Sequence, residues 1–144
     1  MGTIKRSPFK LDQFIVKDLS ILREPVKQGK IDFVINPYGT IDETSKIFKL
    51  TLEVFIKDSN GSFDIKLTAL GFFEFKFEKT PENLSNYFYT NAPAIIFPYI
   101  RAYISSITAL SGLKAVNLPV MNLSNLKDQL KANTIREEVV KIQS

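Results

Sequence analysis

The stretch from Phe48 to Phe77 constrains the fold of this chain most, because its apolar residues alternate with polar ones almost without a break. The first half places these apolar residues on one face: Phe48, Leu50, Leu52, Val54 and Ile56. The second half does the same with Phe63, Ile65, Leu67, Ala69, Phe73, Phe75 and Phe77. Such alternation is typical of strands with one dry face, and Asn60-Gly61 between the halves favours a tight turn. The pattern predicts a long antiparallel hairpin, in which Gly71 marks a bulge or bend.

Two further strands are expected before this hairpin. Residues 9–22 predict one long strand whose two faces are both partly apolar. Residues 31–35 predict a short strand that ends at the turn cluster of residues 36–39. Between them, residues 23–30 contain Pro25 and Gly29 and are expected to form a loop.

Residues 91–113 are mostly apolar, yet they contain Pro93, Pro98 and Arg101. A membrane span is disfavoured, because the apolar run is short and Arg101 would cost about 2.5–3.5 kcal/mol near the middle of a bilayer. Since proline is tolerated in the first turn of a helix, we expect a helix that begins near Phe97 and ends at Gly112. Its apolar stripe comprises Ile96, Tyr99, Ile100, Tyr103, Ile107 and Leu110.

The C-terminal part is expected to contain a second, shorter helix. An extended segment around Pro119 precedes it, and Asn122 or Ser124 caps it. One side of this helix carries Leu123, Leu126 and Leu130. Residues 1–133 are therefore expected to form a single α+β domain, and residues 134–144 to extend the helix or to fray as a tail.

The residues that usually carry enzyme chemistry are missing. The 144 residues include neither His nor Cys, which removes the usual zinc ligands, the commonest catalytic bases and the thiol nucleophile. No glycine-rich phosphate loop is present. Asp18 stands out among the carboxylates, but a surface aspartate beside a lysine explains it better than a catalytic role. We therefore expect no enzyme, no metal and no cofactor, and the lack of cysteine fits a cytoplasmic protein.

The net charge of +4 does not point to nucleic acid, because basic residues alternate with acidic ones, as at Lys17-Asp18 and Lys57-Asp58. A surplus of apolar residues is more informative. Phe55, Leu70 and Phe72 lie on the nominally polar face of the predicted hairpin. One domain of this size has difficulty burying both faces of its sheet, so the surplus favours oligomerisation, an apolar binding surface, or both.

Three motifs resemble the SecB family of protein-export chaperones, in the family's order. They are VKDLS (residues 16–20), NAPAIIFPYIRAYIS (residues 91–105) and VNLPVMNLSNL (residues 116–126), and the resemblance covers about residues 9–130. It implies a four-stranded antiparallel sheet with a crossover loop after the first strand, one long helix and a shorter C-terminal helix. It also implies a homotetramer, built as a dimer of dimers, that acts as an ATP-independent holdase for unfolded polypeptide clients.

The resemblance also implies which residues act. The client groove would comprise Pro25, Val26, Ile31, Phe33, Ile35, Leu123, Leu126 and Leu130. For Leu126 and Leu130, a place in the core is an equal alternative. Tyr99, Tyr103 and Ile107 are expected at the oligomer interface, and Asp18 is a candidate contact for a partner protein.

The chain also departs from the family pattern. Many members end in a Cys/His zinc tail that binds the SecA motor and present an acidic surface to it, whereas this basic chain ends in REEVVKIQS. The acidic residue often found four positions after the matched aspartate is Leu22 here. These departures argue against SecA as a partner and leave holdase activity untouched. They fit a SecB-like chaperone that protects the antitoxin of a toxin–antitoxin system, and a basic nucleic-acid-binding module is a more distant alternative.

Overall fold

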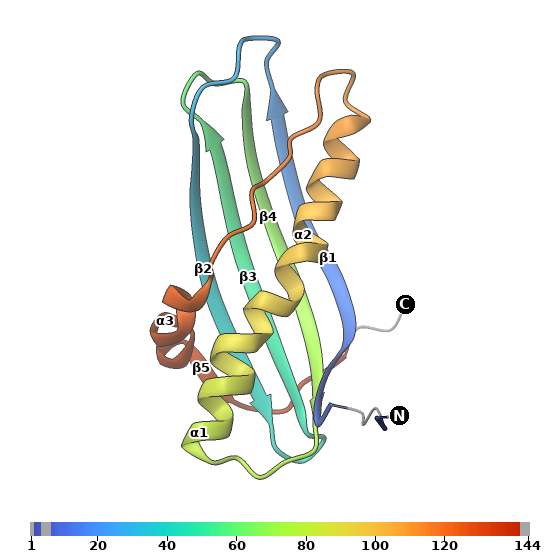
Figure 1. Cartoon of the computed structure of the whole chain (residues 1–144), viewed down its shortest axis with the longest axis vertical. Helices are drawn as coiled ribbons and strands as arrows, with labels where there is room; N and C mark the ends of the chain where they lie inside the picture. The colour runs from blue at the N-terminus through green and yellow to red at the C-terminus, as the bar shows by residue number, and fades with distance from the viewer. Residues whose placement is uncertain (1, 4–6, 142–144) are drawn as a thin grey trace.

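The computed structural model describes residues 2–3 and 7–141, in which one five-stranded sheet carries its helices on one face (Figure 1). The strands follow the order β1-β4-β3-β2-β5. All neighbours are antiparallel except β5, which runs parallel to β2. The expected four strands are thus joined by a short fifth one. Their bounds are β1 Phe9–Arg23, β2 Ile31–Asp42, β3 Ile47–Asp58, β4 Phe63–Phe75 and β5 Thr134–Arg136.

The predicted hairpin is confirmed as β3 and β4, joined by a turn in which Gly61 adopts a positive φ of 78°. Gly71 marks neither a bulge nor an irregular pairing. A Cβ at this position would lie 2.9 Å from Ile96 Cγ2 and 3.0 Å from Phe73 Cε2. Glycine is therefore required because the long helix approaches the sheet closely here.

Strand β1 contains two bulges, which explain why both of its faces look partly apolar in the sequence. The register against β4 shifts between Leu11 and Gln13 and again between Val16 and Asp18. Each shift inserts one unpaired residue and so reverses the alternation. As a result, one and the same face carries Leu11, Phe14, Val16, Leu19 and Ile21, all of which pack against the core.

Strand β2 does not end at residues 36–39, so that expectation is wrong. It continues through Pro37 to Asp42. The carbonyl of Pro37 accepts a hydrogen bond from Asn133 Nδ2, on the side away from β3. Because the N and C=O of a strand residue point to the same side, the missing N–H of Pro37 also faces away from β3 and costs no bond in that ladder.

The long helix begins sixteen residues earlier than expected. Helix α1 (Pro81–Asn83) passes into a π-helix, η1 (Leu84–Asn91), and then into α2 (Ala92–Ala109), so Pro98 lies inside the helix. The start carries a recognisable signal, because Thr80 Oγ1 accepts a hydrogen bond from Asn83 N and Pro81 opens the first turn. Pro98 and Ala94 both lie on the exposed side, so water can satisfy the Ala94 carbonyl that Pro98 leaves unpaired.

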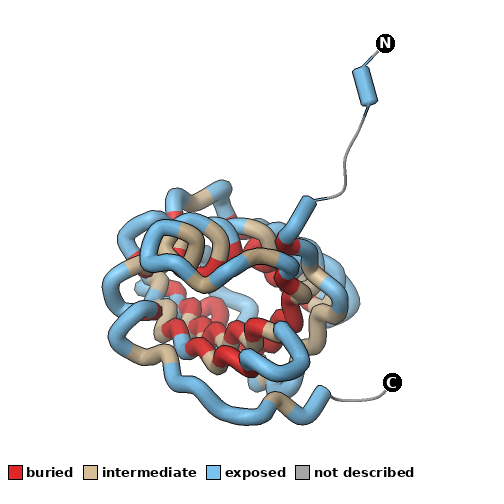
Figure 2. The backbone as a smooth tube through the Cα atoms, turned by 90° about the horizontal axis from the view of Figure 1, so that it is seen from below, coloured by how far each residue is buried: buried red, intermediate tan, exposed pale blue. Residues whose placement is uncertain are grey.

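The core lies between the sheet and a layer formed by α2 and the segment that follows it (Figures 1 and 2). This segment is extended, as expected, and leads into the 3₁₀-helix η2 (Ser124–Leu126) and helix α3 (Lys127–Ala132). Helix α2 buries one stripe against the sheet: Ala92, Pro93, Ile96, Phe97, Ile100, Ile104 and Thr108. Aromatic rings fill the end of the core near η1, where Phe48 stacks on Phe88 at 4.4 Å between centroids.

The C-terminal residues do not extend α3. Residues 134–136 form β5, and residues 137–141, here called the C-terminal strap, cross the outer face of the sheet, which is the face opposite α2 (Figures 1 and 2). Val139 N donates to Asp42 Oδ2 at the β2 end of this path, and Lys141 pairs with Asp12 at the β1 end. The path is therefore held at both ends. The tail residues 142–144 lie outside the described residues.

Candidate functional site

The loop between β1 and β2 is fixed to the tip of the β3–β4 hairpin. The buried carboxylate of Asp58 accepts hydrogen bonds from Gly29 N at 2.7 Å and from the backbone and hydroxyl of Ser62. Asn60 Nδ2 also donates to the carbonyl of Lys27 at 3.2 Å. Burial raises the pKa of Asp58, but these hydrogen bonds outweigh it and hold the pKa below its usual value. The loop is therefore a preorganised part of the surface.

Two predicted client residues, Pro25 and Val26, lie on this loop and are exposed, with Val26 at 52%. They line a cavity of about 300 Å³ together with Leu113, on the segment that follows α2. Arg23 lies at the same place and fixes that segment, since its Nη2 donates to the carbonyl of Lys114 at 2.8 Å. The loop thus offers apolar side chains beside a hollow.

Strand β2 follows the loop and has a free edge over its first half. Strand β5 pairs only with residues Gly39–Ile41, so residues 31–35 have no strand partner on this side within the described part of the chain. Three predicted client residues, Ile31, Phe33 and Ile35, lie here and are half-buried against the core. Their backbone N–H and C=O groups point away from β3, as the carbonyl of Pro37 and the N–H of Gly39 do. We call residues 31–35 the β2 edge.

The leucines of the final helix lie in the core, which is the alternative stated above for Leu126 and Leu130. Leu123, Leu126 and Leu130 are all buried, with Leu126 at 7% and Leu130 at 0%. They belong to the main core, and α3 packs over β2 and η1. In this conformation they present no surface to a client, because their own chain fills that position.

The outward side of α2 carries the predicted oligomer residues. Tyr99 is 52% exposed, whereas Tyr103 and Ile107 are half-buried and Leu110 is almost fully exposed. Tyr99 stacks on Phe14 of β1 at 5.5 Å between ring centroids. These side chains form an apolar strip beside the one that faces the sheet, so α2 is apolar on more than its buried side.

The outer face of the sheet carries mixed charge. Asp18 is exposed there, opposite Thr68 of β4. Phe55 is half-buried and lies under the ammonium group of Lys66, 5.6 Å from the ring centroid. Leu70 and Phe72, however, are buried at 2% and 1% within this single chain. These two residues therefore do not contribute to the apolar surplus from which oligomerisation or an apolar binding surface was expected.

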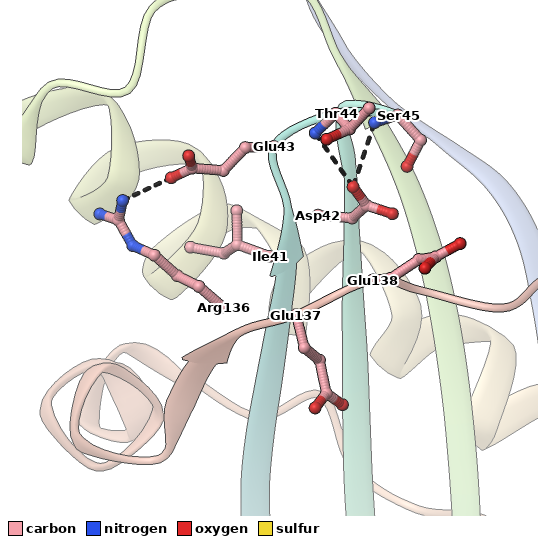
Figure 3. A pocket seen from close by; sticks show the side chains of 8 residues that line it. All are labelled: Ile41, Asp42, Glu43, Thr44, Ser45, Arg136, Glu137 and Glu138. Atoms are coloured by element: carbon pink, nitrogen blue, oxygen red, sulfur yellow. Dashed lines mark hydrogen bonds and ion pairs between the residues drawn. The ribbon is translucent and has the colours of Figure 1, made fainter.

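A second cavity, of about 440 Å³, lies between the β2–β3 turn and the C-terminal strap (Figure 3). Asp42 forms its centre and accepts hydrogen bonds from Val139 N, Thr44 N and Ser45 N at 3.0–3.1 Å. The Val139 bond is the main reason that the pKa of Asp42 is lowered to about 2. Sequence reasoning missed this site, although an aspartate before Glu-Thr-Ser is typical of a turn. The carboxylates of Asp42 and Glu43 fix the C-terminal segment to the β2–β3 turn.

The described part of the chain, residues 2–3 and 7–141, lacks two features. None of its helices combines the length and apolarity needed to cross a bilayer. It also contains no group of three or more acidic side chains arranged to hold a metal ion.

Comparisons with known proteins agree with this architecture. An uncharacterized protein of Methanocaldococcus jannaschii is 31% identical, in an alignment that covers 90% of this chain and 91% of the relative. A solved structure with the same fold is the SecB-like chaperone of Mycobacterium tuberculosis in complex with a peptide from the HigA1 antitoxin. It matches 78% of this chain and 87% of its own with a TM-score of 0.65 and 15% identity. The family model described as preprotein translocase subunit SecB matches residues 4–134, and the chain therefore belongs to the SecB family.

Proposed function

We propose that this chain is an ATP-independent holdase, which binds extended segments of unfolded polypeptides along the β2 edge and the loop before it. The free β2 edge carries this proposal, because it combines unpaired backbone groups with half-buried apolar side chains at Ile31, Phe33 and Ile35. An unpaired edge is a ready template for another strand, and the fixed loop adds Pro25 and Val26 at its end.

The mode of binding follows from these groups. A client segment would form backbone hydrogen bonds with alternate residues of the β2 edge, each worth about 0.5–1.5 kcal/mol net. Its apolar side chains would cover Ile31, Phe33 and Ile35 on the side that faces α2. Because backbone hydrogen bonds do not involve the side chains of the client, this surface would bind many sequences with low specificity.

Two classes of client fit this proposal. Family membership supports precursors on their way to export. The likeness to a chaperone solved with an antitoxin peptide supports an antitoxin segment as the alternative. The net charge is +4, whereas SecB family members usually present an acidic surface to SecA. Delivery to SecA is therefore not part of the proposal.

We further propose that the protein is a cytoplasmic homotetramer without enzymatic activity. The apolar strip of Tyr99, Tyr103 and Ile107 supports assembly through α2, because such a strip is costly to leave in water. Leu110 extends the same strip at the end of the helix and is largely exposed in the single chain.

The test is to dilute a chemically unfolded client into buffer with and without the protein, in the absence of nucleotide, and to follow aggregation by light scattering. We expect suppression at stoichiometric amounts that persists between low and moderate salt, because apolar contacts are not screened. If the protein does not suppress aggregation and instead binds nucleic acid with a steep loss of affinity in salt, the more distant alternative is correct.

A further inference from the structure

Helix α3 is not a stable unit by itself. It has six residues, and isolated helices of this length are unstable in water. Leu126 and Leu130 dock it over β2 and η1. Before it, the chain from residue 114 to residue 123 is extended without pairing to the sheet. The position of α3 therefore depends on these leucines and on the segment that follows.

The link from α3 to β5 is fixed to the edge of β2. Asn133 Nδ2 donates to the carbonyl of Pro37 at 3.1 Å, and Gly39 N donates to the carbonyl of Asn133 at 3.2 Å. Residues Thr134–Arg136 then pair with Gly39–Ile41. The helix thus leads directly into a strand that continues where the free β2 edge stops.

The C-terminal strap holds this strand down by polar contacts. Glu137 N donates to the carbonyl of Ile41 at 3.1 Å, and Val139 N donates to Asp42 Oδ2 at 3.0 Å. Ion pairs add Arg136 with Glu43 and Lys141 with Asp12 (Figure 3 shows the first). Of the apolar residues here, Ile135 and Val140 are exposed and Val139 is half-buried. Segments held in this way open at a much lower free energy than the whole domain.

We propose that β5 and the C-terminal strap form a latch that keeps α3 closed, and that release of the latch opens an apolar surface for an extended client segment. The surface comprises Leu123, Leu126 and Leu130, which are covered only while α3 is docked. Release would also lengthen the free β2 edge as far as Ile41, because β5 would leave that position. The opening itself is independent of any client, whereas its consequence for binding rests on the proposed function.

The latch can be weakened by removing a single backbone donor. Val139→Pro removes the N–H that binds Asp42, and proline fits an extended segment. Val139→Ala is the matched control, because it shortens the same side chain and keeps the donor. Glu137→Pro and Glu137→Ala form a second, independent pair at the bond to Ile41.

The readout is backbone hydrogen exchange by mass spectrometry, measured without client, followed by the aggregation assay. We expect about tenfold faster exchange in residues 127–132 of the proline variants than of the alanine variants, with unchanged exchange in β3 and β4. We also expect the proline variants to hold clients more tightly. If Val139→Pro also accelerates exchange in β3 and β4, this variant has unfolded the whole domain. The comparison of Glu137→Pro with Glu137→Ala then decides whether α3 is latched.

Two results would overturn the latch. One is equal exchange of residues 127–132 in the proline and alanine variants. The other is faster exchange without tighter holding, in a protein whose wild type does hold clients. If the wild type holds no client at all, the proposed function fails, whereas the exchange experiment still decides whether α3 is latched.

Discussion

Phe33 and Phe55 allow the client surface to be tested against a closely matched control. Both are phenylalanines near the same end of two paired strands, and both are half-buried. Phe33 pairs with Ile56 and faces the α2 side beside the free β2 edge, whereas Phe55 lies on the outer face. The same substitution at both positions therefore separates the loss of stability from the loss of client contact.

The expected magnitudes follow from this geometry. Complete burial of a phenylalanine contributes about 1.5–3 kcal/mol, so replacing a half-buried one by serine should cost about 1–2 kcal/mol of unfolding free energy at either position. Client contact should differ. Phe33→Ser should weaken holding by about 1–3 kcal/mol, or roughly 5- to 150-fold in Kd, whereas Phe55→Ser should leave it near wild type.

The assay combines denaturant unfolding with binding of a fluorescently labelled unfolded client, measured by anisotropy. A third variant is Leu126→Asn. Because Leu126 is buried, this change should lower the free energy of unfolding by about 2–5 kcal/mol and should favour undocking of α3. Equal loss of client affinity in the two phenylalanine variants would refute the placement of the client surface on the α2 side of β2. Unchanged affinity in Phe33→Ser would do the same.

Three further outcomes are expected. Tyr103→Asp should split the assembly, because it places a charge in the apolar strip of α2; sedimentation that shows the same large species for the variant would contradict this. The contribution of Asp42 to stability should be complete above its usual pKa of 3.8 and be lost as the pH falls through about 2, since folding lowers its pKa. Asp42→Asn should flatten that part of an acid-unfolding curve. A chelator should leave the melting temperature unchanged, because the sequence has neither His nor Cys, and a lower melting temperature would reveal a metal site.

The parts of the fold that the sequence predicts well are those governed by local pattern. Strands β3 and β4 alternate without interruption over their first halves, and Asn60-Gly61 joins them, so the hairpin is readable from the residues alone. The start of the long helix also carries a local signal. Thr80 and Pro81 supply an N-cap and a first-turn proline, whereas Pro98, which lies inside the helix, favours a later start.

The parts that could not be predicted depend on contacts between distant residues. The local sequence does not reveal the two bulges of β1, because each bulge is defined by the pairing with the partner strand β4. Pro37 is typical of the end of a strand. Only the structure shows that its carbonyl faces Asn133, on the side away from β3, so that β2 can continue past it. The burial of Leu123, Leu126 and Leu130 likewise depends on where α3 docks, so of the expected client residues only those on the loop and β2 remain accessible.

The C-terminal strap changes the argument for assembly as well. The sequence alone assigns Leu70 and Phe72 to a face that one chain cannot cover, which favours a partner there. In the structure, the strap crosses this face between Asp42 on β2 and Asp12 on β1, and Phe72 lies on β4 between these two anchors. Since both residues are buried without a second molecule, the outer face no longer argues for oligomerisation. The case for assembly therefore rests on α2, where Tyr99 and Leu110 remain exposed next to Tyr103 and Ile107, and a second copy of this chain is best sought on that strip.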